Sequence, residues 1–260
     1  MHPIFLSIGK FSIRSYGVMA AVGFLLGCWL VNINRKYAKM STDQASTSLF
    51  VAMIVGIIGA RVFYVVQFFK YYRNNLWGIF RIDQGGLVFY GGFLFGLAAL
   101  WLYCRYHKLD IVRVLDIYAP AVALAHACGR IGCFLNGCCW GTPTDFLLGV
   151  EYPAGSPPAL CYPEAHLHPV QLYESAEEFL LAGLYFYLVR HKKRGVAMSS
   201  FLIFYGIIRF FNEMVRGDNP KIPGTILSEA QWIGVLLVPA GILLLIHFLR
   251  HEPKNSELSH

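Results

Sequence analysis

Residues Gly129 to Gly141 read Gly-Arg-Ile-Gly-Cys-Phe-Leu-Asn-Gly-Cys-Cys-Trp-Gly, and this stretch decides how the rest of the chain is interpreted. It places Arg130 near the end of a long apolar run that begins near Val114. Insertion scales put an arginine at the centre of a membrane helix at about 2.5–3.5 kcal/mol, so an ionisable residue there indicates a functional site with a partner. We therefore examine the other polar residues of the apolar runs as the surroundings of Arg130.

The composition is that of a membrane protein. Of the 260 residues, 56% are hydrophobic and 14% are charged, whereas charged residues make up about 25% of soluble domains. The formal net charge of +7 fits Lys and Arg collected in cytoplasmic loops. We therefore do not predict nucleic-acid binding.

Membrane spans need about 20 mostly apolar residues. The sequence predicts an all-α integral membrane protein, a single polytopic domain over 1–260, with seven transmembrane helices at 14–33, 46–69, 86–104, 114–136, 172–190, 197–215 and 226–249. More Lys and Arg fall on the side of the C-terminus, so the positive-inside rule predicts a cytoplasmic C-terminus and an N-terminus outside. A loop at about 137–171 then lies outside, and a polar tail after about 252 is cytoplasmic.

Arg209, Glu213 and Arg216 recur at i, i+4 and i+7, which places them on one helix face. This stripe is either an ion-pair network that locks two helices together or a site for an anion. We favour the anion site, because the surplus positive charge leaves an arginine available. The planar guanidinium also suits phosphate, and desolvation strengthens such a contact.

Paired glycines flank Tyr90 at the start of the third span, with Gly85 and Gly86 before it and Gly91 and Gly92 after it. They permit either close backbone packing or an irregular turn that admits a lipid headgroup. Tyr90 would donate a hydrogen bond to phosphate or, with its pKa lowered from about 10 by an arginine, accept a proton. The alternative is an interfacial tyrosine in a glycine-packed helix.

Three further polar residues lie at or inside spans. His168 precedes Pro169 at the start of the fifth span, and its free pKa near 6.5 suits a proton acceptor. A histidine at a helix start is as often only a hydrogen-bonding residue. Tyr16 opens the first span, and Arg61 in the second needs a counter-charge, backbone carbonyls or a bound phosphate.

Cys133, Cys138, Cys139 and Cys161 fall in one loop region, where a disulfide requires an oxidising compartment. A zinc site is disfavoured, because Cys133-x4-Cys138-Cys139 is not a standard zinc spacing and adjacent cysteines do not easily bind one tetrahedral ion. We predict no metal and no cofactor.

In order and spacing, four motifs resemble the prolipoprotein diacylglyceryl transferase family. They are the glycine–arginine segment, the Gly-Gly turn before the third span, His-Pro-x-Gln-Leu-Tyr-Glu and Arg-x3-Glu-x2-Arg. The resemblance covers essentially the whole chain and implies a multi-pass enzyme of the bacterial inner membrane. It implies transfer of the diacylglyceryl group of phosphatidylglycerol to the lipobox cysteine thiol of preprolipoprotein signal peptides, with release of sn-glycerol 1-phosphate. Phosphatidylglycerol, these signal peptides and membrane lipid are the implied partners.

The resemblance carries over to site residues one position at a time. Arg130 matches the family's phosphatidylglycerol-binding arginine, and Arg209 matches a second essential arginine. Tyr90 departs from a histidine that is a candidate base in the family, and Cys133 and Cys138 depart from asparagine and glutamate. The predicted catalytic residues are Arg130, Arg209, Tyr90 and His168. The predicted substrate-binding residues are Arg130, Tyr16, Arg61, Gly91, Gly92, Asn136, Glu213 and Arg216.

Several alternatives stay open on the sequence. The proton acceptor is Tyr90, His168 or neither of them. A lipid or anion transporter would also place arginines within its spans, but it would move its substrate without releasing glycerol phosphate. A noncatalytic homologue that binds lipoprotein signal peptides is a third reading, which the departures at Tyr90, Cys133 and Cys138 favour.

Overall fold

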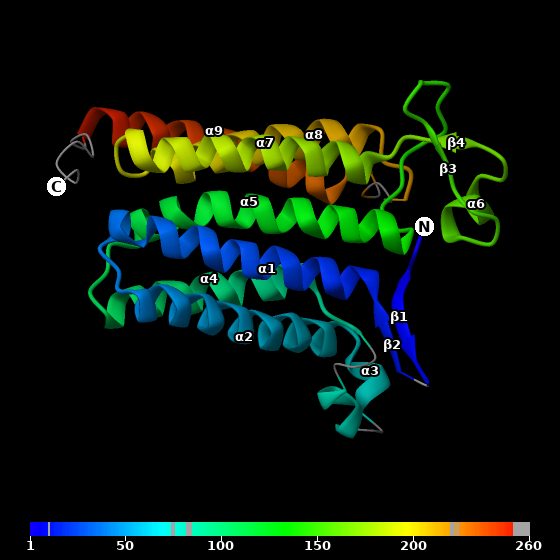
Figure 1. Cartoon of the computed structure of the whole chain (residues 1–260), viewed down its shortest axis with the longest axis horizontal. Helices are drawn as coiled ribbons and strands as arrows, with labels where there is room; N and C mark the ends of the chain where they lie inside the picture. Colours follow the sequence, from blue (N-terminus) through cyan, green and yellow to red (C-terminus); the bar gives the residue numbers. More distant parts are fainter. Residues whose placement is uncertain (10, 74–75, 82–84, 219–221, 223, 252–260) are drawn as a thin grey trace. The chain divides into compact units, whose positions relative to one another are not determined.

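A computed structural model describes residues 1–9, 11–73, 76–81, 85–218, 222 and 224–251, so the predicted tail after about 252 lies outside the described residues (Figure 1). All seven predicted apolar runs are helices, with ends that differ from the predicted ones by a few residues. They are α1 (Ser15–Asn34), α2 (Thr42–Gln67), α4 (Phe89–Tyr106), α5 (Ile111–Asn136), α7 (Val170–His191), α8 (Val196–Met214) and α9 (Glu229–His251).

Five of these helices, namely α1, α2, α5, α8 and α9, are long and apolar enough to cross a membrane. The sequence of α7 is less apolar because it carries Glu174, Glu177 and Glu178. The helical, membrane-embedded class predicted from the sequence is thus confirmed. The number of spans and their orientation stay predictions.

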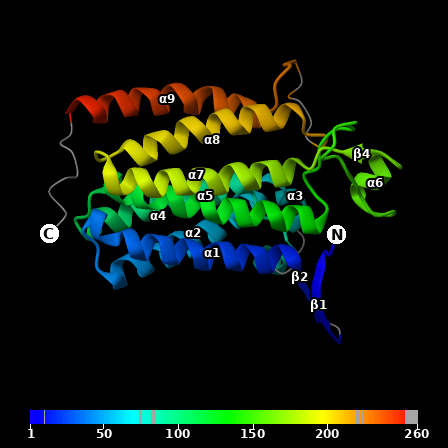
Figure 2. The same cartoon turned by 45° about the horizontal axis from the view of Figure 1, so that its top comes forward.

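The chain divides into two compact units, a large one formed by Met1–Tyr37 and Leu115–His260 and a small one formed by Ala38–Val114. In the small unit α2 and α4 lie side by side (Figure 1 and, turned by 45°, Figure 2), and glycines form their contact. A Cβ on Gly91 would meet the carbonyl oxygen of Gly59 at 2.6 Å, and one on Gly92 would meet that of Gly56 at 3.3 Å. Gly91 and Gly92 therefore serve close helix packing, which supports the packing alternative over a headgroup-binding turn.

In the large unit α5 supplies much of the buried core, with Ile117, Ala123 and Ala127 fully buried. The start of α8 is fixed to α5 by Asp116, whose carboxylate accepts the N–H groups of Gly195 at 2.6 Å and Met198 at 2.8 Å. A carboxylate at a helix N-terminus satisfies donors that lack a partner within the helix. This contact helps to position α8, which carries Arg209, against α5, which carries Arg130.

The structure also contains short elements that the sequence analysis did not predict. Two antiparallel strand pairs, β1 with β2 and β3 with β4, lie before α1 and between α5 and α7. These small elements leave the helical class unchanged. The short elements are β1 (Ile4–Ile8), β2 (Phe11–Arg14), β3 (Val150–Glu151), β4 (His166–Leu167), α3 (Phe69–Tyr72), α6 (Pro157–Cys161), η1 (Arg35–Ala38) and η2 (Leu76–Phe80).

Three segments join in a backbone ladder formed by residues 140–142 after α5, His168 before α7 and residues 215–217 after α8. We call it the site ladder. Its hydrogen bonds run from Gly141 N–H to His168 O (3.0 Å), His168 N–H to Thr142 O (3.0 Å), Thr142 N–H to Val215 O (2.8 Å) and Gly217 N–H to Trp140 O (2.9 Å). The ladder fixes the ends of three helices to one another.

Candidate active site

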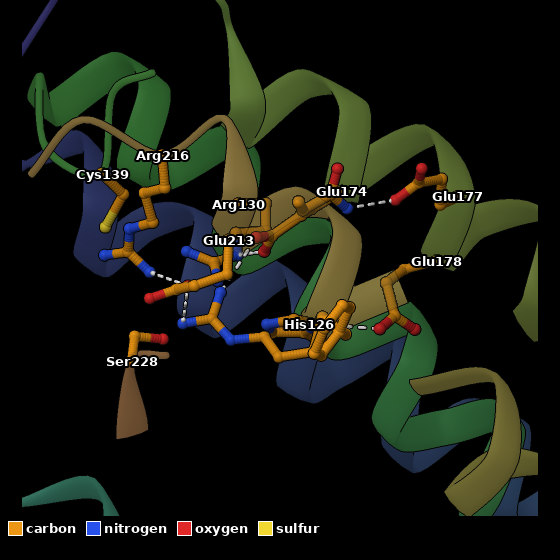
Figure 3. Close-up of polar contacts among 12 residues, drawn as sticks. His126, Arg130, Cys139, Glu174, Glu177, Glu178, Glu213, Arg216 and Ser228 are labelled. Carbon is orange, nitrogen blue, oxygen red and sulfur yellow. Dashed lines mark hydrogen bonds and ion pairs between the residues drawn. The ribbon is translucent and has the colours of Figure 1, made fainter. Parts of the chain in front are cut away.

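Two arginines from different helices share one buried carboxylate. Arg130 on α5 contacts Glu174 on α7 through Nε and Oε2, and Arg209 on α8 donates from Nη1 to Glu174 Oε1 at 3.0 Å (Figure 3). Arg130 is 8% exposed and Glu174 is 2% exposed. Electrostatic contacts between such buried groups are much stronger than in water, because the local dielectric constant is low. The centre of the site is therefore a charged cluster that connects α5, α7 and α8.

The predicted stripe on α8 continues this cluster. Glu213 Oε2 lies 3.2 Å from Arg209 Nη2 and 3.7 Å from Arg216 Nη1. Arg216 Nε also donates to Asp218 Oδ1 at 2.6 Å. Burial opposes the charge on Arg216, but the contacts with Asp218, Cys139 and Glu213 prevail and raise the pKa of its guanidinium above the usual value.

The structure corrects one step of the sequence argument. The stripe alone has surplus positive charge, but each of its arginines has a carboxylate partner in the folded chain, since Glu174 and Asp218 come from outside the stripe. Both arginines of the stripe therefore have carboxylate partners, and the surplus charge that the spacing implied is balanced within the fold. Sequence spacing does not reveal this, because Glu174 lies on another helix and Asp218 follows the end of α8.

Further carboxylates surround the cluster. His126, one turn before Arg130, lies 3.1 Å from Glu178 between Nδ1 and Oε1, and Asn212 donates to Glu177 Oε2 at 2.5 Å. Sequence reasoning did not assign these residues. The available signal was the pair Glu177 and Glu178 inside a predicted span, where acidic side chains are rare and usually functional.

Two predicted substrate-binding residues flank the end of α5. The Tyr16 ring lies against Gly132, where an added Cβ would meet Tyr16 Cδ2 at 3.2 Å, and the tyrosine is 47% exposed. Asn136, the last residue of α5, hydrogen-bonds to Cys138 through its side chain. The structure thus brings Tyr16 and Asn136 to the end of the helix that carries Arg130.

The two candidate proton acceptors have different surroundings. His168 is held by its backbone in the site ladder, and its Nδ1 lies 3.3 Å from the Tyr173 hydroxyl. Tyr90 belongs to the small unit, is 41% exposed, and has its ring centroid 5.8 Å from that of Phe89. The identity of the proton acceptor stays a prediction.

Arg61 is satisfied by backbone carbonyls. A guanidinium has five N–H bonds, and this one makes five hydrogen bonds of 2.7–3.1 Å to carbonyl oxygens of the segment after α3, namely those of Gly78, Ile79, Arg81, Gly85 and Gly86. Of the partners considered from the sequence, the structure shows the backbone carbonyls. Arg61 therefore organises this segment rather than supplying a spare donor for phosphate.

The cysteines after Arg130 converge. The Sγ atoms of Cys133, Cys138 and Cys139 all lie within 4.8 Å of one another, whereas Cys161 is exposed. All seven cysteines are free thiols in this structure. The sulfur atoms of the adjacent residues Cys138 and Cys139 thus lie close together, and whether one ion binds both stays open.

Comparison with known proteins gives one consistent result. A family model described as prolipoprotein diacylglyceryl transferase matches residues 3–247. A relative from Clostridium kluyveri is 36% identical over 239 residues, which cover 91% of this chain and 94% of the relative. Relatives from Clostridium botulinum strain Langeland (36% over 258 residues, 99% of both chains) and Clostridium tetani (35% over 245 residues, 94% and 96%) carry the same name. That name is phosphatidylglycerol--prolipoprotein diacylglyceryl transferase.

Proposed function

The chain belongs to the prolipoprotein diacylglyceryl transferase family, and from that premise we propose that it uses phosphatidylglycerol as lipid donor and a preprolipoprotein as acceptor. It transfers the diacylglyceryl group to the lipobox cysteine thiol of the signal peptide, which is the first step of bacterial lipoprotein maturation. The products are a thioether and sn-glycerol 1-phosphate. The charged cluster around Glu174 is the observation that best supports this chemistry.

The reaction is a displacement at carbon. The lipobox thiolate attacks the glycerol carbon that bears the phosphate oxygen, a C–S bond forms, and the C–O bond breaks with both electrons passing to oxygen. The thiol proton goes to a base of the protein. Charge therefore grows on the departing phosphate monoester, and fixed cationic donors in a dry site stabilise such charge most in the transition state.

Arg130 and Arg209 are the donors that we assign to the phosphate. They come from two helices, and both contact the same carboxylate of Glu174. A phosphodiester has the charge and oxygen spacing to replace that carboxylate and accept both guanidinium groups. In this proposal Glu174 holds the arginines in position until the headgroup arrives, and Arg216 and Glu213 keep Arg209 in place.

The lipobox thiol must lose its proton. Cysteine has an ordinary pKa of about 8.5, and a cationic surrounding favours its thiolate. His168 and Tyr90 are the two residues we propose as acceptors, and replacing each in turn separates them. Loss of the proton acceptor lowers the rate of transfer mainly at low pH, because less of the thiol ionises there by itself. The pH profiles of the His168→Asn and Tyr90→Phe variants therefore identify the acceptor.

We further propose seven spans in the bacterial inner membrane, with the N-terminus and the 137–171 segment outside and the C-terminus in the cytoplasm. The loop charges and the glutamate-containing helix α7 support this count, because its acidic residues pair with arginines and an asparagine of neighbouring helices. Reporter fusions after His107 and after Gly155 test it. A cytoplasmic signal at Gly155 would overturn the orientation.

The direct test uses purified protein, phosphatidylglycerol and a lipobox peptide. We expect glycerol phosphate release together with a diacylglyceryl mass gain on the peptide, and neither product with a Cys-to-Ser peptide. Movement of lipid across a vesicle membrane without release would support a transporter instead. Peptide binding without turnover, in folded protein, would support a noncatalytic homologue.

A further inference from the structure

The three converging thiols form a feature that the transferase chemistry does not use. Cys133 lies in the last turn of α5, and Cys138 and Cys139 follow the turn at Gly137. Their sulfur atoms lie within 4.8 Å of one another. Metal–thiolate bonds of about 2.3 Å place sulfurs on a common ion about 4 Å apart, so small side-chain rotations suffice to bring all three onto one ion.

The backbone holds this arrangement in place. Gly137 has φ +75° and Cys139 has φ +66°, a conformation uncommon for a residue with a side chain. The Cys139 N–H donates to Asp218 Oδ2 at 3.0 Å, and the next residues enter the site ladder. The turn that brings Cys138 and Cys139 toward Cys133 is thus fixed by contacts to the segment after α8.

Cationic side chains lie beside the three thiols, and a metal ion binds cysteine in its thiolate form. The Cys139 side chain lies next to Arg216 (Figure 3), and the charges of both Arg130 and Arg216 act on Cys139. Nearby guanidinium groups therefore offset the negative charge of a metal–thiolate complex.

We propose that Cys133, Cys138 and Cys139 form a binding site for one thiophilic metal ion, and that Cu(I) is the preferred ion. Among the described residues, the metal-binding group consists of thiols alone. Soft thiolate ligands select Cu(I), whereas structural zinc sites take four ligands in a tetrahedron. Binding replaces the protons of the remaining S–H groups with the ion, so those protons are released and no electron is transferred.

The test measures the metal directly and does not depend on transferase activity. The full chain is purified in detergent without oxygen, reduced, and titrated with Cu(I) against a coloured Cu(I) chelator. We expect one equivalent to be retained, with three sulfur neighbours in the copper X-ray absorption spectrum. Retention of no copper, or a spectrum with fewer than three sulfurs, would overturn the proposal.

Variants show which thiols bind the ion. We expect Cys138→Ser to weaken Cu(I) binding by more than about 100-fold, because loss of a merely supporting contact costs only 10–100-fold. The matched control is Cys161→Ser, which removes an exposed thiol outside the group and should leave binding unchanged. Equal binding by both variants would contradict the assignment. If the Cys138→Ser variant does not fold, the copper X-ray absorption spectrum of the wild-type protein decides whether three sulfurs bind the ion.

Zinc provides the comparison for ion choice. We expect Zn(II) to bind more weakly than Cu(I) in the same competition format, since three thiols leave its fourth position to water. Tighter retention of zinc would overturn the preference for Cu(I). Because the transferase assay is performed separately, loss of lipid transfer and loss of metal binding remain distinguishable results.

Discussion

Arg130 contacts Glu174 at a position where the carboxylate is only 2% exposed, so the pair is shielded from water. The same carboxylate also accepts Arg209, which makes it the common partner of two helices. Leaving one member of a buried ion pair alone costs far more than a surface contact is worth. The cluster therefore links the stability of the large unit to the groups that we assign to the phosphate.

Arg130→Ala removes one donor from the proposed phosphate site. We expect glycerol phosphate release to fall by at least about 10²–10³-fold, the usual loss when a fixed transition-state donor is removed. Arg73→Ala is the control, because Arg73 is an exposed residue outside the cluster. Near-normal transfer by the Arg130 variant, in protein shown to be folded, would contradict the assignment of Arg130 to the phosphate.

Glu174→Gln keeps the shape of the side chain but removes the shared counter-charge. We expect a loss of about 3–5 kcal/mol in the free energy of unfolding, because buried Arg130 and largely buried Arg209 lose their common carboxylate. Glu177→Gln, on the same helix, should cost less, since Glu177 pairs with neutral Asn212. Thermal unfolding in detergent checks this order. Equal melting temperatures for the two variants would contradict it.

Arg61→Lys keeps the charge but loses the planar fork that reaches five carbonyls. We expect faster proteolysis near residues 78–86 at a given temperature, because those carbonyls lose donors. Arg73→Lys should leave the cleavage rate near that of wild type. If the Arg61 variant has an unchanged cleavage rate but a raised KM for phosphatidylglycerol, the result would instead support a role of Arg61 in lipid binding.

Gly141→Ala tests the site ladder. A Cβ at Gly141 would meet the carbonyl oxygen of His168 at 2.5 Å and Val170 Cγ2 at 2.8 Å, so the backbone must shift. We expect a lower melting temperature and reduced transfer together. Gly183→Ala is the matched control, since nothing lies within 4 Å of a Cβ there and alanine favours a helix. A drop of the same size in both variants would argue against the ladder.

Cys138 should stay reactive in acid. Its pKa is lowered to about 3 by hydrogen bonds from Cys133 and Cys139, so the thiolate persists until the pH falls through that value. We expect alkylation of metal-free protein by iodoacetamide, followed by peptide mass spectrometry, to change little between pH 8 and pH 5. A reference cysteine peptide, with a thiol pKa of about 8.5, should lose nearly all its rate over that range. A parallel decline at Cys138 would refute the assignment of a stabilised thiolate.

The helices were predictable from sequence because each is a long, mostly apolar run, a signal that needs no knowledge of neighbours. The stripe Arg209, Glu213 and Arg216 was also predictable, since helical spacing alone places it on one face. The partners were not, because Glu174 and Asp218 come from other segments and only the packing of α5, α7 and α8 brings them near. The partners of Arg61 were not predictable for the same reason. The sequence indicates that its guanidinium needs acceptors, but it does not indicate which segment supplies the carbonyl groups.

The site ladder has a consequence for the order in which the chain folds. Thr142 pairs with Val215, so this contact cannot close until α7 and α8 have both been synthesised. Arg130 emerges from the ribosome before Glu174 and Arg209, and it enters the membrane without its final partners. Assembly of the charged cluster is therefore a late event in biogenesis, and chains released before α8 is complete lack the contacts that join its three helices.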